Sequence, residues 1–396
     1  MQKRKIGLFL DSDPSIGGTF QYNQIILEAV TSFSKVEFDI VIGYTREIWI
    51  EYLKHYEAPT KYIPLGAMSK YIPLLVRRSF IPMSWWRLIS RHFFQPAKRL
   101  LDEKCDLWIF PSQDAWTYLM PVPSVGVIHD LMHRYEKRFP EVGEYKEFSW
   151  REWHYKRLCS WATAILVDSE LGKSHVIDSY HIDPIRVHPL PYIPPKYILD
   201  ESIVNDSNSN LQLPKKFLFY PAQFWEHKNH KILVNAIAKL KQVLPDIKLV
   251  LVGTKKNGYN SALRLIRELG LSEDIFILGY VSEDNILDLY RNARALVMPT
   301  FFGPTNMPPM EAMKLGCPVA VSKVYAMPEQ LGDAALFFDP KSEEEIVDTI
   351  FRLWTDDSLC EELTKKGLKR SAGWTQNNFS QLLEKIIIGY ADPKSN

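Results

Sequence analysis

The stretch FFGPTNMPPMEAMKLGCPV at 301–319 combines residue types that could bind a phosphate and a sugar. It follows an apolar run that ends at Thr300, and Pro308 and Pro309 suit the first turn of a helix, where a missing N–H costs nothing. The free backbone N–H groups at such a helix start favour an anion such as a phosphate. Glu311 lies one turn further in, where a carboxylate could accept hydrogen bonds from a vicinal diol such as a ribose.

The loop before this helix start adds polar groups at short range. Gly303 allows close approach of a ligand to the main chain, while Thr305 and Asn306 provide short donors and acceptors. The alternative is an ordinary Asn/Pro helix start followed by a solvated Glu311. Spacing alone leaves both interpretations open.

A second loop, QFWEHKNH at 223–230, places Lys228 between an apolar run and a stretch of helical periodicity. Lysine is a compact cation that suits phosphate oxygens, although an ordinary solvated lysine would look the same. Gln223 lies five residues before it. His227 and His230 form an H-x-x-H pair with no third ligand at useful spacing, so we expect no metal site.

Two loops of the first half could also face a ligand. Gly17, Gly18 and Thr19 lie between the first apolar run and the first helical stretch, where paired glycines let the backbone close against a ligand or simply form a turn. His129 and Asp130 leave a later apolar run. This histidine could donate to a substrate hydroxyl, or it could be a core histidine held by Asp130.

The elements that must position these loops alternate between short apolar runs and helical stretches such as 230–244. This alternation predicts an α/β fold with two doubly wound, Rossmann-like domains, in which ligands bind at the carboxyl ends of parallel strands, in a cleft between the domains. The runs are 5–10, 38–44, 106–110, 124–130 and 164–169 in the first half, and 217–222, 247–253, 275–280, 295–300, 318–322 and 335–339 in the second.

The length of 396 residues agrees with about two domains. The polar stretch ESIVNDSNSNLQLPKK at 201–216 is the clearest break and is predicted to be the linker. We therefore predict an N-terminal domain over 1–205, a C-terminal domain over 214–375, and a C-terminal helix within 376–396 that could cross back to the first domain.

Composition excludes several classes of protein. The net charge of +1 gives no reason to expect a nucleic-acid partner. The four cysteines are far apart, which argues against disulfides and favours a cytoplasmic location. We find neither a signal sequence nor a run of about 20 apolar residues that could span a bilayer.

The motif GTKKNGYN at 253–260 has the glycine spacing of a phosphate loop, but it has Tyr259 and Asn260 where Lys and Ser/Thr are required.

The stretch 71–100 is basic and aromatic, and it contains no acidic residue. Basic groups interleaved with large apolar ones suit docking on an anionic membrane, and core packing with a solvated basic face is the alternative. The residues concerned are Arg77, Arg78, Arg87, Arg91, Lys98 and Arg99 with Phe80, Trp85, Trp86, Phe93 and Phe94.

The combination of these motifs resembles family 4 of the glycosyltransferases, which have the GT-B architecture. The motifs are GG after the first strand, HD in the first half, KN opening the second half, and FGPTNMPPMEAMKLGCPV. Within this family, the motifs are most similar to those of the mannosyltransferase branch that builds bacterial O-antigen and other surface polysaccharides. This resemblance implies a retaining hexosyltransferase that takes its sugar from a nucleotide diphosphate sugar, with GDP-mannose the first choice. It also implies a lipid-linked glycan acceptor, no required cofactor, and a location in the cytoplasm or at the inner face of the membrane.

The resemblance also implies a role for each matching residue. Lys228 would hold the donor diphosphate, Glu311 the ribose hydroxyls, and His129 would point at the sugar. The remaining donor-binding positions are Gly17, Gly18 and Thr19 near the diphosphate, Tyr280 and Val281 near the base, and Gln223, Gly303, Pro304, Thr305, Asn306 and Met307 near the sugar and phosphate.

Two positions depart from the family pattern. Gln223 stands where the family has a phosphate-binding arginine, and Gly303 stands where it has the first of two glutamates. Phosphate binding would then depend more on Lys228, and sugar selectivity on Thr305 and Asn306. Two alternatives stay open: a nucleotide-sugar hydrolase or epimerase of the same fold, and a catalytically weak scaffold subunit, which the two departures suggest.

Overall fold

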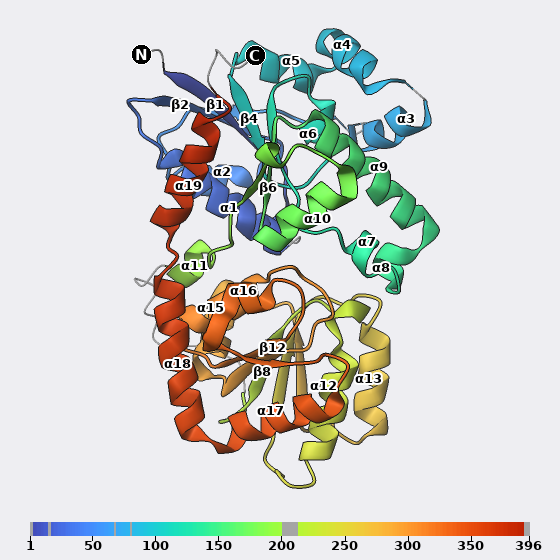
Figure 1. Ribbon diagram of the computed structural model, residues 1–396, viewed down its shortest axis with the longest axis vertical. Helices are drawn as coiled ribbons and strands as arrows, with labels where there is room; N and C mark the ends of the chain where they lie inside the picture. The colour runs from blue at the N-terminus through green and yellow to red at the C-terminus, as the bar shows by residue number, and fades with distance from the viewer. Residues whose placement is uncertain (1–2, 15–16, 67–68, 80, 200–212, 392–396) are drawn as a thin grey trace. The chain divides into compact units, whose positions relative to one another are not determined.

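The computed structural model describes residues 3–14, 17–66, 69–79, 81–199 and 213–391 (Figure 1). The chain divides into two compact units. The first unit comprises Met1–Leu131, Ser149–Pro191 and Gln376–Asn396, and the second comprises Met132–Phe148 and Tyr192–Thr375.

The first unit is built on a seven-stranded parallel sheet with the order β3-β2-β1-β4-β5-β6-β7. Because successive strands run outward from β1 in one direction and from β4 in the other, the strand order reverses between these two strands. The strands are β1 (Arg4–Leu10), β2 (Phe38–Tyr44), β3 (Thr60–Tyr62), β4 (Leu107–Phe110), β5 (Ser124–Val127), β6 (Ala164–Val167) and β7 (Val187–Pro189).

The second unit has a six-stranded parallel sheet with the order β10-β9-β8-β11-β12-β13. Its strand order reverses between β8 and β11. Open α/β sheets bind ligands outside the strand carboxyl ends at such a reversal. The strands are β8 (Leu218–Pro221), β9 (Leu249–Val252), β10 (Ile275–Gly279), β11 (Ala295–Met298), β12 (Val319–Ser322) and β13 (Leu336–Phe338).

Helices cover both sheets. Those of the first unit are α1 (Gly18–Thr31), α2 (Trp49–Leu53), α3 (Ile72–Arg78), α4 (Met83–Phe93), α5 (Gln95–Asp102), α6 (Trp116–Leu119), α10 (Glu170–Tyr180) and α19 (Gln376–Ile388). Those of the second are α7 (Met132–Tyr135), α8 (Pro140–Gly143), α11 (Lys196–Leu199), α12 (His230–Leu240), α13 (Tyr259–Glu268), α14 (Glu283–Asn292), α15 (Met307–Lys314), α16 (Met327–Leu331), α17 (Glu343–Thr355) and α18 (Asp357–Ala372). Helix α9 (Tyr145–Trp161) begins in the second unit and continues into the first.

Every predicted apolar run contains a strand, and most are fully buried because parallel strands are covered on both faces. The sequence did not predict β3 and β7, each of which has three residues and no long apolar run. The last helix, α19, packs against α1 of the first unit, with Phe379 next to Tyr22 (Figure 1).

The division of the chain differs from the predicted domain boundaries at two places. Residues 132–148 were expected in the N-terminal domain, but they belong to the second unit, as does Tyr192–Thr375, whose first residues were also expected in the N-terminal domain. The predicted linker at 201–216 lies mostly outside the described residues, which resume at Leu213.

Gly253 follows β9 and is the first glycine of GTKKNGYN, the stretch that has the glycine spacing of a phosphate loop. The structure gives another reason for this glycine. Its φ is +152°, and a Cβ there would lie 2.2 Å from the carbonyl oxygen of Ala222. The glycine is therefore required because two backbone segments meet, with the amide of Phe224 donating to the carbonyl of Thr254 at 3.1 Å.

Gly253→Ala should lower the free energy of unfolding of the second unit by about 3–5 kcal/mol, because it adds overpacking to backbone strain. Gly270→Ala is the matched control: its φ is +67° but nothing lies within 4 Å of an added Cβ, so strain alone should cost about 1–2 kcal/mol. Urea unfolding measures both, and equal losses would contradict the close-approach explanation.

Candidate functional site

The loop after β8 presents Lys228. Residues Glu226–Lys228 form one turn of 3₁₀ helix, and Asn229 has a positive φ of 58°, which lets α12 start at once. The hydroxyl of Tyr220 donates to the carbonyl of Lys228 at 2.9 Å. A buried strand residue thus fixes the backbone of this lysine, while the lysine itself is half-buried at the sheet edge.

The loop after β11 meets this lysine. The ammonium Nζ of Lys228 donates to Oδ1 of Asn306 at 3.4 Å. The backbone amide of Asn306 in turn donates to Oε1 of Gln330 at 3.0 Å, and Nε2 of Gln330 donates to the carbonyl of Asn306 at 2.8 Å. Since β8 and β11 flank the reversal of strand order, these residues lie where an open α/β sheet binds its ligand.

Gly303 is required by the position of Asn306. Its φ is +139°, and a Cβ at this position would lie 2.4–2.9 Å from the amide group of the Asn306 side chain. Any side chain at 303 would therefore displace the residue that contacts Lys228. The departure from the family pattern at this position is coupled to Asn306 by sterics.

Glu311 lies in α15, which starts as predicted with prolines in its first turn. It is 8% exposed, so the solvated alternative is wrong. The hydroxyl of Tyr290 donates to Oε2 of Glu311 at 2.6 Å. Burial raises the pKa of Glu311 to about 7 despite this bond.

The other predicted residues of the second unit lie at the same sheet edge. Thr305 and Met307 are buried, and the carbonyl of Pro304 accepts from the amide of Ala326 at 2.9 Å. Tyr280 and Val281 follow β10, with Tyr280 74% exposed and Val281 half-buried against the core.

Gln223 is already engaged within its own loop. Its side-chain oxygen accepts a hydrogen bond from the indole N–H of Trp225 at 2.9 Å. A neutral side chain occupied in this way supplies no charge for a phosphate. In this loop the positive charge comes from Lys228.

The first unit holds His129 two residues past the end of β5. Its backbone amide donates to the side chain of Gln113, and its ring packs edge-on against Tyr22 with centroids 4.9 Å apart. Burial lowers the pKa of His129 to about 4, outweighing Asp130 and a hydrogen bond to the carbonyl of Pro111. The imidazole is therefore neutral at neutral pH.

Gly17 and Gly18 stand at the start of α1, as expected. Gly17 has a φ of +68° and its amide donates to the carbonyl of Pro14 at 3.2 Å, so the glycine is required by the turn. Gly18 and Thr19 form the first residues of the helix. An added Cβ at either glycine meets nothing within 4 Å, so the backbone here is open to a ligand.

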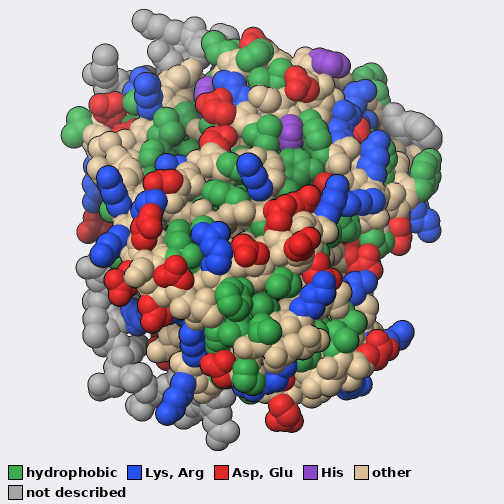
Figure 2. Space-filling model, turned by 60° about the horizontal axis from the view of Figure 1, so that its bottom comes forward, with side chains coloured by type: hydrophobic (Ala, Val, Ile, Leu, Met, Phe, Trp, Pro, Cys, Tyr) green, Lys and Arg blue, Asp and Glu red, His purple; other side chains and the backbone are tan. Residues whose placement is uncertain are grey.

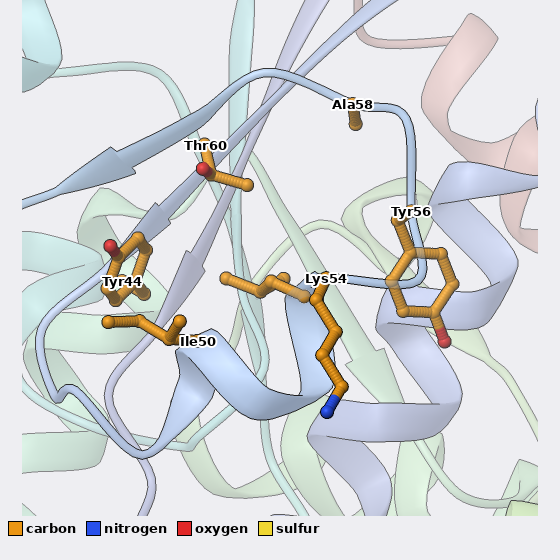
Figure 3. Close-up of a pocket in the computed structure, with 7 residues that line it drawn as sticks. Tyr44, Ile50, Lys54, Tyr56, Ala58 and Thr60 are labelled. Carbon is orange, nitrogen blue, oxygen red and sulfur yellow. The ribbon is translucent and has the colours of Figure 1, made fainter.

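A surface cavity of about 250 Å³ lies elsewhere in the first unit (Figure 3). It opens between α2 and the β2–β3 edge of the sheet and is below the roughly 300 Å³ of a typical small-molecule site. None of the predicted site residues lines it. The lining residues are Tyr44, Ile50, Leu53, Lys54, Tyr56, Ala58 and Thr60.

Sequence reasoning missed the residues that hold the site from behind. Tyr290 and Gln330 lie in helices with no motif of their own, and Glu141 lies in a segment assigned to the other domain. Glu141 accepts a hydrogen bond from Nδ1 of His227 at 2.6 Å. A partner so distant in sequence leaves no local signal.

Glu311→Gln should stabilise the protein at alkaline pH. Because the pKa of Glu311 is raised from about 4.5 to about 7 on folding, the ionised carboxylate lowers stability progressively as pH rises through this window. The amide can still accept from Tyr290, so we expect a gain of about 1–3 kcal/mol at pH 8 and little at pH 5. Thermal unfolding between pH 5 and 8 measures the effect, with the exposed Glu361→Gln as the control. Parallel curves for wild type and Glu311→Gln would refute the assignment.

Comparison with known proteins assigns the second half of the chain. Residues 203–370 match the family model described as glycosyl transferases group 1. A stretch of 101 residues is 38% identical to O-antigen chain mannosyltransferase B of Escherichia coli, covering 26% of each chain. Another of 175 residues is 27% identical to the serotype-specific mannosyltransferase WbdA of Escherichia coli, covering 43% of this chain and 21% of that protein. The matches thus span only about a fifth to a quarter of these relatives' lengths.

Solved structures resemble the chain over nearly its whole length. A glycosyltransferase from Rickettsia africae has a TM-score of 0.69 at 13% identity and covers 99% of this chain and 100% of its own. Sucrose-phosphate synthase from Thermosynechococcus elongatus has a TM-score of 0.71 at 16% identity, covering 98% and 99%. At such identities the likeness establishes the fold. Residues 203–370 therefore match the glycosyl transferases group 1 model and have mannosyltransferases among their relatives, in a chain whose two Rossmann-like units have GT-B glycosyltransferases as structural neighbours.

Proposed function

We propose that this chain is a retaining glycosyltransferase that moves a hexose, mannose or a related sugar, from a nucleotide diphosphate sugar to a growing, lipid-linked surface glycan. The observation that carries the proposal is the contact between Lys228 and Asn306 at the strand-order reversal of the second unit, 3.4 Å between Nζ and Oδ1. It places a cation beside a helix start, and both favour a phosphate.

The chemistry asks for positive charge on the leaving group. As the bond between C1 of the sugar and the diphosphate oxygen breaks, Lys228 and the positive end of the α15 dipole stabilise the charge that develops there. The acceptor oxygen bonds to C1 from the same face, and its proton leaves with the diphosphate. Glu311 accepts hydrogen bonds from the ribose hydroxyls.

The remaining assignments follow the same scheme. Tyr280 and Val281 contact the base, and Thr305 and Asn306 select the sugar. From the first unit, Gly17, Gly18 and Thr19 approach the diphosphate. His129, neutral at neutral pH, acts as a hydrogen-bonding group near the sugar rather than as a cation.

The names of the relatives support mannose as the sugar. Two of the Escherichia coli proteins and the O-antigen chain mannosyltransferase RfbU of Salmonella typhimurium, 31% identical over 121 residues, are named as mannosyltransferases. GDP-mannose is therefore the donor to test first. UDP-sugars come next, because a structural neighbour, Anabaena HepE, was solved with UDP and glucose.

Lys228→Ala should lower turnover with GDP-mannose or the donor found by screening by at least about 100-fold, because it removes charge stabilisation worth a few kcal/mol. Release of nucleoside diphosphate in the presence and absence of acceptor measures the rate. Acceptor-independent release would instead favour the hydrolase alternative, and nucleotide binding without any release the scaffold alternative. A folded Lys228→Ala protein with a near-normal rate would refute the role of this lysine.

We propose that the first unit docks on an anionic membrane through α4, which presents an apolar face to solvent. Trp85, Leu88 and Phe93 are 65%, 56% and 59% exposed, and Ile89 lies on the same face. Exposed apolar side chains on an amphipathic helix suit insertion at the headgroup boundary. No helix among the described residues is long and apolar enough to cross a bilayer.

Only part of the predicted basic set is free to meet lipid. Arg87 donates to the carbonyls of Tyr118, Met120 and Val122, so it holds a turn of the fold. Arg77 donates to the hydroxyl of Ser149 at 2.6 Å. Trp86, expected to anchor beside Trp85, is buried and donates to the carbonyl of Leu119. Phe94 is buried too, and Phe80 lies outside the described residues. Arg78, Arg91 and Lys98 are exposed. Arg99 is exposed too, but it donates to the carbonyl of Tyr62 at 2.6 Å.

Charge reversal of Arg78, Arg91 and Lys98 to Glu should abolish cosedimentation with anionic liposomes at low salt, since each basic group contributes about 1 kcal/mol. The matched control reverses three exposed basic residues of the second unit, Arg267, Lys365 and Lys369, and should still bind. Wild-type protein that stays in the supernatant at low salt would contradict the docking proposal.

A further inference from the structure

One segment of the second unit comes from inside the sequence of the first. Residues 132–148 follow Leu131 and precede Ser149, both of which belong to the first unit, yet the segment packs within the second. We call residues 132–148 the strap. It contains the short helices α7 and α8.

The strap contacts four of the loops that leave the carboxyl ends of the second sheet. Glu141 reaches the loops after β8 and β9 through His227 and Asn257. Phe139 packs against Phe301 after β11, with ring centroids 5.5 Å apart. The hydroxyl of Tyr325, after β12, donates to Oε1 of Glu136 in the strap at 2.9 Å.

Glu141 makes the most directed of these contacts. Its Oε1 accepts from both the backbone amide of His227 at 3.1 Å and from Nδ1 of the same residue at 2.6 Å. Its Oε2 accepts from Nδ2 of Asn257 at 2.8 Å. Burial alone would raise the pKa of Glu141, but these hydrogen bonds outweigh it and lower the pKa to about 2. The side chain is therefore a carboxylate at neutral pH, and it is only 6% exposed.

His227 links Glu141 to the candidate site, because Glu141 binds its amide and ring while the loop after β11 binds its carbonyl. Its carbonyl accepts from the amide of Phe301 at 2.8 Å and from the hydroxyl of Thr300 at 3.3 Å, which fixes the loop after β8 to the loop after β11. The next residue is Lys228. These two bonds hold the 227–228 peptide through its carbonyl, and Glu141 holds the preceding 226–227 peptide through the amide of His227, so both peptides that lead to Lys228 are fixed.

We propose that Glu141 is a positioning residue for Lys228: through His227 it fixes the backbone from which the ammonium reaches the donor diphosphate. The inference rests on the proposed function, because it assigns Lys228 to that diphosphate. A displacement of about 1 Å at such a group can reduce its effect on the reaction by about 100-fold.

The test is a double-mutant cycle on nucleotide affinity. Isothermal titration with GDP and with UDP measures wild type, Glu141→Ala, Lys228→Ala and the double variant. We expect Glu141→Ala to weaken the nucleotide that wild type binds by about 10- to 100-fold, and by less than about 3-fold when Lys228 is already alanine. A purely structural role would weaken binding equally in both backgrounds, which would overturn the proposal.

Tyr325→Phe is the matched control, since it removes the hydrogen bond between the strap and the loop after β12 but leaves His227 untouched. Its nucleotide affinity should stay within about 3-fold of wild type, and circular dichroism with thermal unfolding shows whether each variant is folded. Glu141→Gln keeps one carbonyl oxygen as an acceptor, and we expect an affinity between those of Glu141→Ala and wild type.

The outcomes separate this inference from the proposed function. If wild type binds neither GDP, UDP nor any other nucleoside diphosphate, the proposed function fails and the inference fails with it. If Lys228→Ala weakens binding while folded Glu141→Ala does not, the function stands and only the role of Glu141 is overturned.

Discussion

A parallel sheet delivers the carboxyl ends of all its strands to one edge, and the arrangement of the second unit depends on this constraint. Because its strand order reverses between β8 and β11, the loops after these two strands lie next to each other at the edge where such sheets bind ligands, and they carry Lys228 and the start of α15. The close approach of Gly253 to Ala222 keeps the loops after β8 and β9 at contact distance, and that of Gly303 to Asn306 keeps the loop after β11 compact. The strand order thus determines where the candidate site lies, and the side chains determine what it can bind.

The buried carboxyl of Glu311 shows what such a site demands of the fold. Tyr290 satisfies one of its oxygens, yet burial still raises its pKa to about 7, so the ionised form is unfavourable in the unliganded protein. Glu141 is also largely buried, but three hydrogen bonds keep its pKa near 2. The two carboxyls differ in the depth of burial, which is greater for Glu311, and in the number of donors around each one. A carboxylate short of donors is suited to receive them from a ligand.

Charge is distributed locally rather than globally. The net charge is only +1, and acidic and basic side chains lie intermixed over most of the face in Figure 2. The basic stretch at 71–100 likewise separates into arginines that hold the fold, such as Arg87, and residues such as Arg91 that face solvent. Composition therefore says little here about binding, whereas the partners of each side chain say a great deal.

The sequence by itself determined the strands other than β3 and β7, their parallel arrangement, the loop that carries Lys228 and the helix that carries Glu311, because buried parallel strands leave apolar runs and helix starts leave prolines. It also pointed to the family through residues close together in the chain. Only the tertiary structure decided that Glu311 is buried, that Gln223 is occupied by Trp225, and that 132–148 packs with the second unit. Each of these depends on contacts between residues that chain order separates or on how a side chain turns within its loop, and neither leaves a periodicity or spacing that can be read along the sequence.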